Sequence, residues 1–340
     1  MKKIILAITF TVIILMGCIS GWLLFGPTLH PEQDAVIFVK TETDYNQFYA
    51  DLKNQQWMRN AWLFDKMSRF SKLPQRLKPG RYSVKNISSL YGLMQKFRTG
   101  SQNEIRFVIN KLRTKEDLAK HISRSFETDS LEMIQFLMSN DSLKSYGVDT
   151  NTMMTLIIPN SYLCWWNGSP RKILDRLSRE STLFWKGKRT AQSQKIGLTP
   201  VEVYTMASIV EEETTKKTDK GKIASVYINR IKQSMKLEAD PTVKYASRQF
   251  SLTRILNVHL AYNSPYNTYQ NIGLPPGPIC TPSIETIDAV LNAPTTDYLF
   301  FVAKPDFSGY SNFSKTYNEH LGYARQYQLA LTKLQQKKKS

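Results

Sequence analysis

Residues 199–215 read TPVEVYTMASIVEEETT, an apolar run that ends in three consecutive glutamates. Thr199, Pro200 and Glu202 form a capping box with proline at the first helical position, which predicts a helix that begins at residue 200 and runs through the glutamates. On a helical wheel, one broad apolar stripe is formed by Val203, Met206, Ala207, Ile209 and Val210. The run therefore predicts a core helix that carries a carboxylate cluster at its C-terminal end.

The three glutamates take different places on this wheel. Glu212 falls nearly opposite the centre of the apolar stripe, whereas Glu211 and Glu213 flank the stripe, one on each side. A carboxyl that acts as an acid near neutral pH must hold its proton, and both burial and nearby negative charge raise the pKa of a carboxyl. We therefore expect Glu212 to face solvent and keep Glu211 and Glu213 as candidates. A glutamate triplet alone is more often a solvated helix surface.

The chain on both sides of this helix predicts an α+β protein. Upstream, strands are expected at 35–40, 77–84 and 104–110, and helices at 43–53, 57–70 and 88–100. Residues 114–187 are expected to be mostly helical. Downstream, helices are expected at about 220–235, at 283–293 and at the C-terminus, with a buried strand at 298–303 and a long loop-rich stretch at 236–283. A loop-rich stretch of this length in a compact domain is usually functional or disordered, and its aromatic residues argue against disorder.

The first residues, MKKIILAITFTVIILMGCISGWLLFG, predict a membrane anchor. Two lysines precede an uncharged run from Ile4 to Phe25, which at about 1.5 Å per residue spans roughly 33 Å and can cross a bilayer core. The stretch ending at Cys18 resembles a lipoprotein cleavage site, but the sequence stays apolar beyond it. We therefore expect an uncleaved helix with Lys2 and Lys3 in the cytoplasm and the rest of the chain outside it, in the periplasm.

The formal net charge of +18 at pH 7 suggests an anionic partner. Nucleic acid, an anionic membrane surface and an anionic wall polymer all fit this charge, as does a general basic surface. The expected topology argues against nucleic acid. The four histidines have no metal-ligand spacing, and Cys164 and Cys280 do not make a disulfide framework. We therefore expect no cofactor and no metal.

Several motifs then occur in a fixed order after the glutamates. They are ASIVEEET (207–214), ASVYINRI (224–231), LEADPTVKYA (237–246), SPYNTYQNIGLPPGPICTPS (264–283) and LFFVA (299–303). Together they resemble the MltG (YceG-like) family of membrane-bound lytic transglycosylases, which cut peptidoglycan glycan strands. The resemblance is dense from residue 199 to about 320, and LKPGRYSV (77–84) resembles the family's LysM-like unit.

The resemblance implies a domain organisation and a reaction. It divides the chain into a transmembrane anchor (1–28), a LysM-like module (33–110), a helical connection that begins the catalytic region (111–198) and a YceG-like catalytic domain (199–340). The implied reaction is endolytic cleavage of the MurNAc-β-1,4-GlcNAc bond with 1,6-anhydroMurNAc ends, on nascent strands near the inner membrane. Peptidoglycan is then the substrate, and peptidoglycan synthases or division and elongation proteins are candidate partners.

The resemblance also assigns site residues. The family pattern I-V-E-x-E-T, with its catalytic glutamate taken at the first E, implies that Glu211 protonates the leaving oxygen and then accepts the proton of the C6 hydroxyl. Glu213 is expected to tune Glu211 or to bind sugar hydroxyls. The remaining residues expected to line the glycan cleft are Asp240, Thr242, Ser264, Tyr266, Asn267, Thr268 and Tyr269. These residue types also build turns, so a structural role stays open.

The sequence departs from the family pattern at three points. Asn160 replaces an acid in IPNSY, Ser311 stands where a histidine is frequent, and NKL (110–112) replaces P-E-G. An alternative function is a non-catalytic, membrane-anchored peptidoglycan-binding or division scaffold. A peptidoglycan hydrolase or amidase lacks the expected metal ligands or Cys-His set. Muropeptide mass spectrometry separates these functions, because a transglycosylase leaves anhydro ends, a hydrolase leaves reducing ends and a binder leaves no products.

Overall fold

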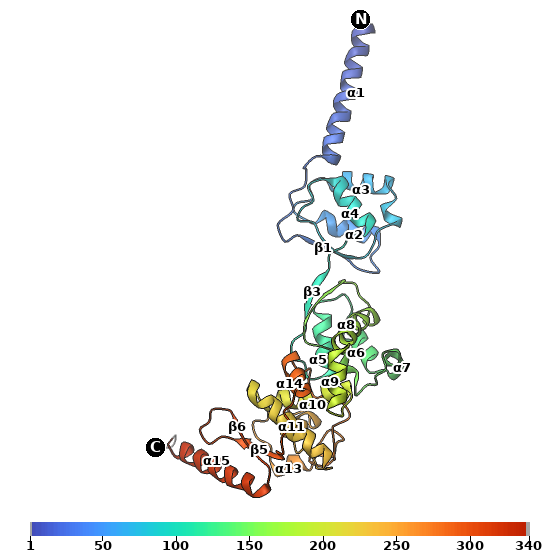
Figure 1. Cartoon of the computed structure of the whole chain (residues 1–340). Helices are drawn as coiled ribbons and strands as arrows, with labels where there is room; N and C mark the ends of the chain where they lie inside the picture. The colour runs from blue at the N-terminus through green and yellow to red at the C-terminus, as the bar shows by residue number, and fades with distance from the viewer. Residues whose placement is uncertain (1, 338–340) are drawn as a thin grey trace. The chain divides into compact units, whose positions relative to one another are not determined.

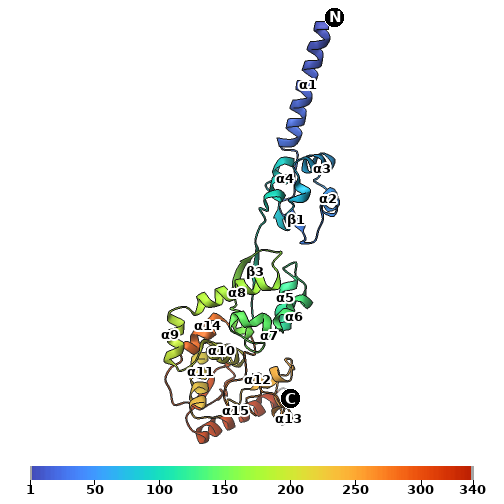
Figure 2. The ribbon, with the colours of Figure 1, turned by 90° about the vertical axis from the view of Figure 1, so that its right-hand side faces the viewer.

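The computed structural model describes residues 2–337, and these fold as an α+β protein with two compact units (Figures 1 and 2). The first unit comprises the chain up to Phe107 together with residues 123–128 and 163–169. The second unit comprises 108–122, 129–162 and the chain from Pro170 onward. The finer division into four parts stays a prediction, as does the likeness of the first unit to LysM.

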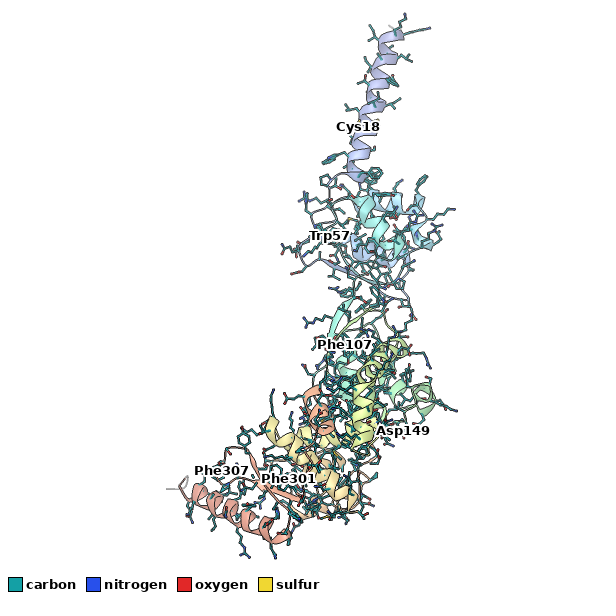
Figure 3. All side chains as sticks on the ribbon, viewed as in Figure 1. Cys18, Trp57, Phe107, Asp149, Phe301 and Phe307 are labelled. Carbon is teal, nitrogen blue, oxygen red and sulfur yellow. The ribbon has the colours of Figure 1, made fainter. Side chains whose placement is uncertain are left out.

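The first unit begins with α1 (Lys2–Phe25), an apolar helix with no buried residue. It has a mean hydropathy of 2.5 and is long and apolar enough to cross a membrane. Figure 3 shows the side chains around the exposed Cys18 extending outward from the helix. The end of the helix is fixed to the unit because the Phe25 ring lies 5.0 Å from the Tyr91 ring and Leu29 is buried in the core.

The rest of the first unit is a small α+β module. Strand β1 (Val36–Val39) pairs antiparallel with β2 (Gly80–Ser83), Val39 opposite Gly80. Its helices are α2 (Tyr45–Lys53), α3 (Ala61–Phe70), the 3-10 turn η1 (Leu73–Gln75) and α4 (Leu90–Thr99). The core contains the buried rings of Phe48, Phe64, Tyr82 and Phe97. Helix α4 ends at Gly100, whose φ of 73° is left-handed, so the expected glycine stop is confirmed.

A helical segment leads into the core of the second unit. The two-stranded sheet β3–β4 (Ile105–Val108 and Ser161–Cys164) is the second sheet of the chain. The helices and 3-10 turns of the segment are α5 (Lys115–Ser123), α6 (Ser130–Leu137), α7 (Asn140–Leu143), η2 (Lys144–Tyr146), η3 (Met153–Leu156), α8 (Pro170–Trp185) and α9 (Lys188–Lys195). The expectation of a mainly helical region is confirmed.

Helix α10 (Pro200–Glu213) is the centre of the second unit. Its capping box is present as expected: the Thr199 hydroxyl accepts from the Glu202 amide, and the Glu202 carboxylate accepts from the Thr199 amide. Every residue from Val203 to Val210 is buried. The helix is packed by α11 (Lys217–Lys232), α12 (Asp240–Ala246) and α14 (Ile284–Leu291). Because neighbours cover it on several sides, α10 lacks the single apolar stripe that the wheel predicted.

The C-terminal part of the second unit follows this core. A short helix, α13 (Asn257–Leu260), interrupts the loop-rich stretch. Strand β5 (Phe300–Ala303) pairs antiparallel with β6 (Ser311–Ser314), and α15 (Tyr317–Lys337) packs against both strands. The expectation of a buried strand at 298–303 is wrong, because β5 lies in a two-stranded hairpin and keeps part of each residue accessible to solvent. Its Phe301, labelled in Figure 3, packs edge-on against Tyr227 of α11.

Candidate active site

The helical wheel predicted that Glu212 faces solvent, and this expectation is wrong. Its carboxylate is mostly buried and lies 2.8 Å from Lys111 Nζ and 3.2 Å from an Arg113 guanidinium nitrogen. Burial alone would raise the pKa of Glu212, but hydrogen bonds and charge from the two basic residues outweigh it and lower the pKa. The basic segment is held in place by the Leu112 amide, which donates to the Thr281 hydroxyl over 2.8 Å. Glu212 is thus an ionised structural carboxylate.

The NKL departure at 110–112 explains the ion pair between Lys111 and Glu212. Lys111 occupies the position of the acid in P-E-G, and its partner is the glutamate at the variable middle position of the triplet. The two other departures have local roles. The Ser311 amide donates to Asp219 over 2.7 Å, and the Asn160 side chain accepts from the Ser161 amide over 2.8 Å.

Glu211 lies in a closed network of donors contributed by α11 and the start of α14. A single oxygen, Oε2, accepts from Lys220 Nζ at 3.3 Å, from Ser283 Oγ at 3.0 Å and from Thr286 Oγ1. The Lys220 ammonium also donates to Thr286 Oγ1 over 2.7 Å, and its side chain is only 7% exposed. This network ties three helices together through one ion pair.

Glu213 lies in a different environment, on the other side of the helix. Its Oε1 accepts from the hydroxyl of Tyr227 over 3.1 Å, and Tyr227 is buried in α11. Burial raises the pKa of Glu213 to about 7, with a hydrogen bond from Tyr227 that lowers it and the negative charge of Asp240 that raises it further. The residue keeps part of its surface accessible. Among the three glutamates, Glu213 is thus the one whose burial raises the pKa toward neutral, and it stays partly exposed.

Asp240 and Tyr269 provide polar groups near this carboxyl. The Tyr269 hydroxyl donates to Asp240 Oδ1 over 2.7 Å, and Asp240 is exposed at the first residue of α12. Tyr266 and Ser264 are partly exposed in the same loop, with the Tyr266 ring 4.9 Å from that of Tyr245. These four residues are exposed or partly exposed, and their place in a glycan cleft stays a prediction.

Three other residues expected in the cleft are buried: Thr242, Asn267 and Thr268. The Thr242 and Thr268 hydroxyls lie 2.9 Å apart, and Thr268 Oγ1 accepts from the Ala239 amide at 3.0 Å. The Asn267 amide donates to the carbonyls of Leu260 and Tyr262. Thr242 and Thr268 thus join the loop to α12, and Asn267 bonds within its own loop, so the hydrogen bonds of all three side chains lie inside the protein.

Sequence reasoning missed four residues that define the two flanking carboxyls: Lys220, Tyr227, Ser283 and Thr286. Tyr227 lies in the helix expected at about 220–235, and an aromatic residue in such a helix is usually part of the core. Ser283 was read only as the start of a helix. A lone lysine in a predicted helix, such as Lys220, is normally solvated, and nothing in its local pattern signals burial.

Comparison with known proteins gives the family. The family model described as the YceG-like family matches residues 37–326. The chain belongs to the YceG-like family. A solved YceG-like protein from Listeria monocytogenes has the same fold, with a TM-score of 0.55 and 24% identity over 86% of this chain and 99% of that one.

Two curated relatives match a shorter part of this YceG-like chain, and both are named endolytic murein transglycosylase. The one from Bacillus subtilis is 48% identical over 119 residues, which are 35% of this chain and 32% of the relative. The one from Streptococcus pneumoniae (strain D39) is 38% identical over 110 residues, which are 31% of this chain and 20% of the relative. The matches thus span about a third and a fifth of these two relatives.

Proposed function

We propose that this chain is a membrane-anchored endolytic transglycosylase that cleaves the MurNAc-β-1,4-GlcNAc bond of peptidoglycan and leaves 1,6-anhydroMurNAc ends. Membership of the YceG-like family and the names of the two relatives support this reaction class. The observation that carries the proposal is the partly accessible Glu213, whose pKa of about 7 suits a proton donor at neutral pH.

We further propose Glu213, in place of Glu211, as the acid and base. In the first half of the reaction the Glu213 carboxyl gives its proton to the glycosidic oxygen as the bond to C1 of the muramyl residue breaks. In the second half the carboxylate takes the proton of the C6 hydroxyl as that oxygen bonds to C1. The carboxyl ends protonated and no water is consumed, so one carboxyl serves where most glycosidases need two.

Glu211 is less suited to this role because of its partners. Its Oε2 already accepts from three donors inside the protein, among them the buried Lys220, so this oxygen is occupied by structural hydrogen bonds. We assign Glu211 the role of a positioning residue that fixes the end of α10. Asp240, next to Glu213 on the exposed side, raises the pKa of the acid and can accept from sugar hydroxyls.

The test is the yield of anhydro-muropeptides from purified variants, measured by mass spectrometry. Glu213→Gln keeps the size and the contact with Tyr227 and should lose about 10²- to 10⁴-fold in rate, the contribution of general acid–base catalysis. Glu212→Gln is the matched control within the same triplet and should keep most of the activity. If folded Glu211→Gln loses the activity while Glu213→Gln keeps it, the first glutamate is the acid, as the family pattern implied.

The topology and the partners belong to the same proposal. With Lys2 and Lys3 in the cytoplasm, the site lies outside the inner membrane, where nascent strands emerge and where synthases or division proteins can be partners. Reducing ends in the products would indicate a hydrolase, and an absence of products would favour the scaffold function.

A further inference from the structure

A cavity in the first unit lies where α1 joins the module. Its volume is about 440 Å³, within the range of small-molecule sites. One wall is the end of α1 and the segment after it, with Trp22, Leu23, Pro27, Thr28, His30 and Glu32. The other wall is formed by Gln56, Trp57, Arg59 and Asn60. The wall is held by the Leu29 amide, which donates to the Ser88 carbonyl over 2.8 Å, and by the Thr28 hydroxyl, which donates to the Leu23 carbonyl.

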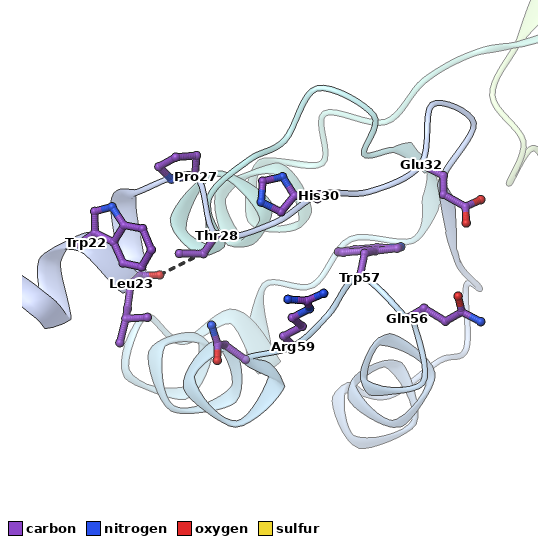
Figure 4. Close-up of a pocket in the computed structure, with 10 residues that line it drawn as sticks. Trp22, Leu23, Pro27, Thr28, His30, Glu32, Gln56, Trp57 and Arg59 are labelled. Carbon is purple, nitrogen blue, oxygen red and sulfur yellow. Dashed lines mark hydrogen bonds between the residues drawn. The ribbon is translucent and has the colours of Figure 1, made fainter.

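The cavity contains one cation and one anion, separated by an aromatic ring. Figure 4 shows the Arg59 guanidinium and the His30 ring turned toward each other, with Trp57 beside Arg59 and Glu32 beyond Trp57. Among residues 2–337, neither the Arg59 nor the Glu32 side chain has an ion pair or a hydrogen bond. Two opposite charges that line one cavity without pairing to each other fit a ligand that carries both charges.

The depth of the cavity indicates where such a ligand comes from. Helix α1 can cross a membrane and ends at Phe25, so Trp22 and Leu23 lie at the edge of the apolar span. Lipid phosphates lie at this depth, and tryptophan is enriched there because its ring is apolar and its N–H is polar. Arginine binds a phosphate through two parallel hydrogen bonds, and an indole face attracts an ammonium group.

We propose that this cavity binds the headgroup of a zwitterionic, amine-bearing phospholipid of the phosphoethanolamine type. Arg59 and His30 take the phosphate, and Glu32 and the face of Trp57 take the ammonium. A headgroup with the phosphate charge alone would satisfy Arg59 but leave Glu32 facing an anion. The site would hold the first unit at one depth and orientation on the membrane. The inference uses the candidate membrane helix and is independent of the proposed reaction.

The experiment is native mass spectrometry of the full chain in detergent with equal amounts of phosphatidylethanolamine and phosphatidylglycerol that share the same acyl chains. The wild type should retain phosphatidylethanolamine in preference. Arg59→Gln should lower retention of both lipids about tenfold, the scale of one lost charge-assisted hydrogen bond. Glu32→Gln should keep phosphatidylglycerol and lose the preference. Both side chains lack partners in the folded chain, so both variants should fold, which circular dichroism checks.

The matched control is Arg76→Gln, which removes an equally exposed arginine from the same module outside this cavity. It should behave as the wild type. The proposal is overturned if Arg76→Gln lowers retention as much as Arg59→Gln, since a general basic surface would then suffice. Preference of the wild type for phosphatidylglycerol also overturns it. If soluble O-phosphoethanolamine binds as tightly as the lipid, the site takes a free phospho-amine and the assignment to a membrane lipid fails.

Discussion

Glu211 and Glu213, at the end of α10, should respond to the same substitution with opposite changes in stability. Glu211→Gln removes the carboxylate partner of Lys220, whose side chain is buried. Breaking a buried ion pair from one side costs about 3–5 kcal/mol of unfolding free energy, and the nearby Glu285, 3.6 Å from Lys220, favours the lower end. At roughly 2–4 °C per kcal/mol, the melting temperature should fall by about 6–12 °C.

Glu213→Gln should instead stabilise the chain at alkaline pH. The pKa of Glu213 rises from 4.5 to about 7 on folding, so the folded state binds the proton more tightly than the unfolded state. Below pH 4.5 both states are protonated and the group costs nothing. Above pH 7 Glu213 is ionised in both states. Each pKa unit of difference between them is worth about 1.36 kcal/mol, so the ionised carboxylate lowers the free energy of unfolding by roughly 3 kcal/mol at most. Glutamine carries no charge, so Glu213→Gln should be more stable than the wild type by nearly this full amount at pH 8. At pH 5 the gain should be only about a quarter as large.

The assay is thermal unfolding of each purified variant by circular dichroism at pH 5 and pH 8. Lys220→Met with Glu211→Gln completes a double-mutant cycle and should restore part of the stability that Glu211→Gln loses, because the unpaired charge is gone. A drop in melting temperature at pH 8 for Glu213→Gln would refute the buried, proton-holding carboxyl. Wild-type stability of Glu211→Gln would refute the role given to its network.

Four further outcomes follow from the same contacts. Tyr227→Phe removes a hydrogen bond that lowers the pKa of Glu213. The pH at which kcat/KM falls should therefore rise by about one to two pH units. The control Tyr204→Phe, in α10, should leave this pH unchanged. Asp240→Asn removes a charge that raises this pKa and should move the fall toward lower pH, by less because Asp240 is exposed. Binding of the full chain to peptidoglycan sacculi should weaken between low salt and about 0.5 M, and salt-independent binding would assign it to stacking and hydrogen bonds. Protease added to spheroplasts should degrade the chain, and full protection would reverse the proposed orientation.

Most of the fold could be predicted because its signals are local. The capping box at Thr199, the glycine stop at Gly100 and the apolar run of α1 each lie within one turn or one helix, and each was confirmed. The strand at 298–303 was expected to be buried because it is apolar throughout. Its exposure depends on having a single strand partner, β6, which no local pattern specifies.

The cleft residues were chosen by chemical type, and type alone does not decide which way a side chain points. Thr242 and Thr268 have the hydroxyls of a sugar-binding loop, yet these hydroxyls bond to each other at 2.9 Å. Asn267 was read as a cleft residue and instead caps two carbonyls of its own loop. A loop of this length needs internal polar partners for its backbone, and short polar side chains supply them.

The different partners of Glu211 and Glu213 come from the helix that follows α10. Residues two apart on a helix point about 200° away from each other, so Glu211 and Glu213 must meet different neighbours. A three-residue turn at 214–216 leads into α11, on which Lys220 and Tyr227 are seven residues, about two turns, apart and therefore share a face. That face gives an ammonium to Glu211 and a phenol to Glu213. A buried ammonium forms an ion pair, while a phenol offers one hydrogen bond and cannot offset burial. The residue types at positions 220 and 227, not the triplet itself, therefore decide that Glu211 has a charged partner and Glu213 a neutral one, and our proposal of Glu213 as the acid rests on this difference.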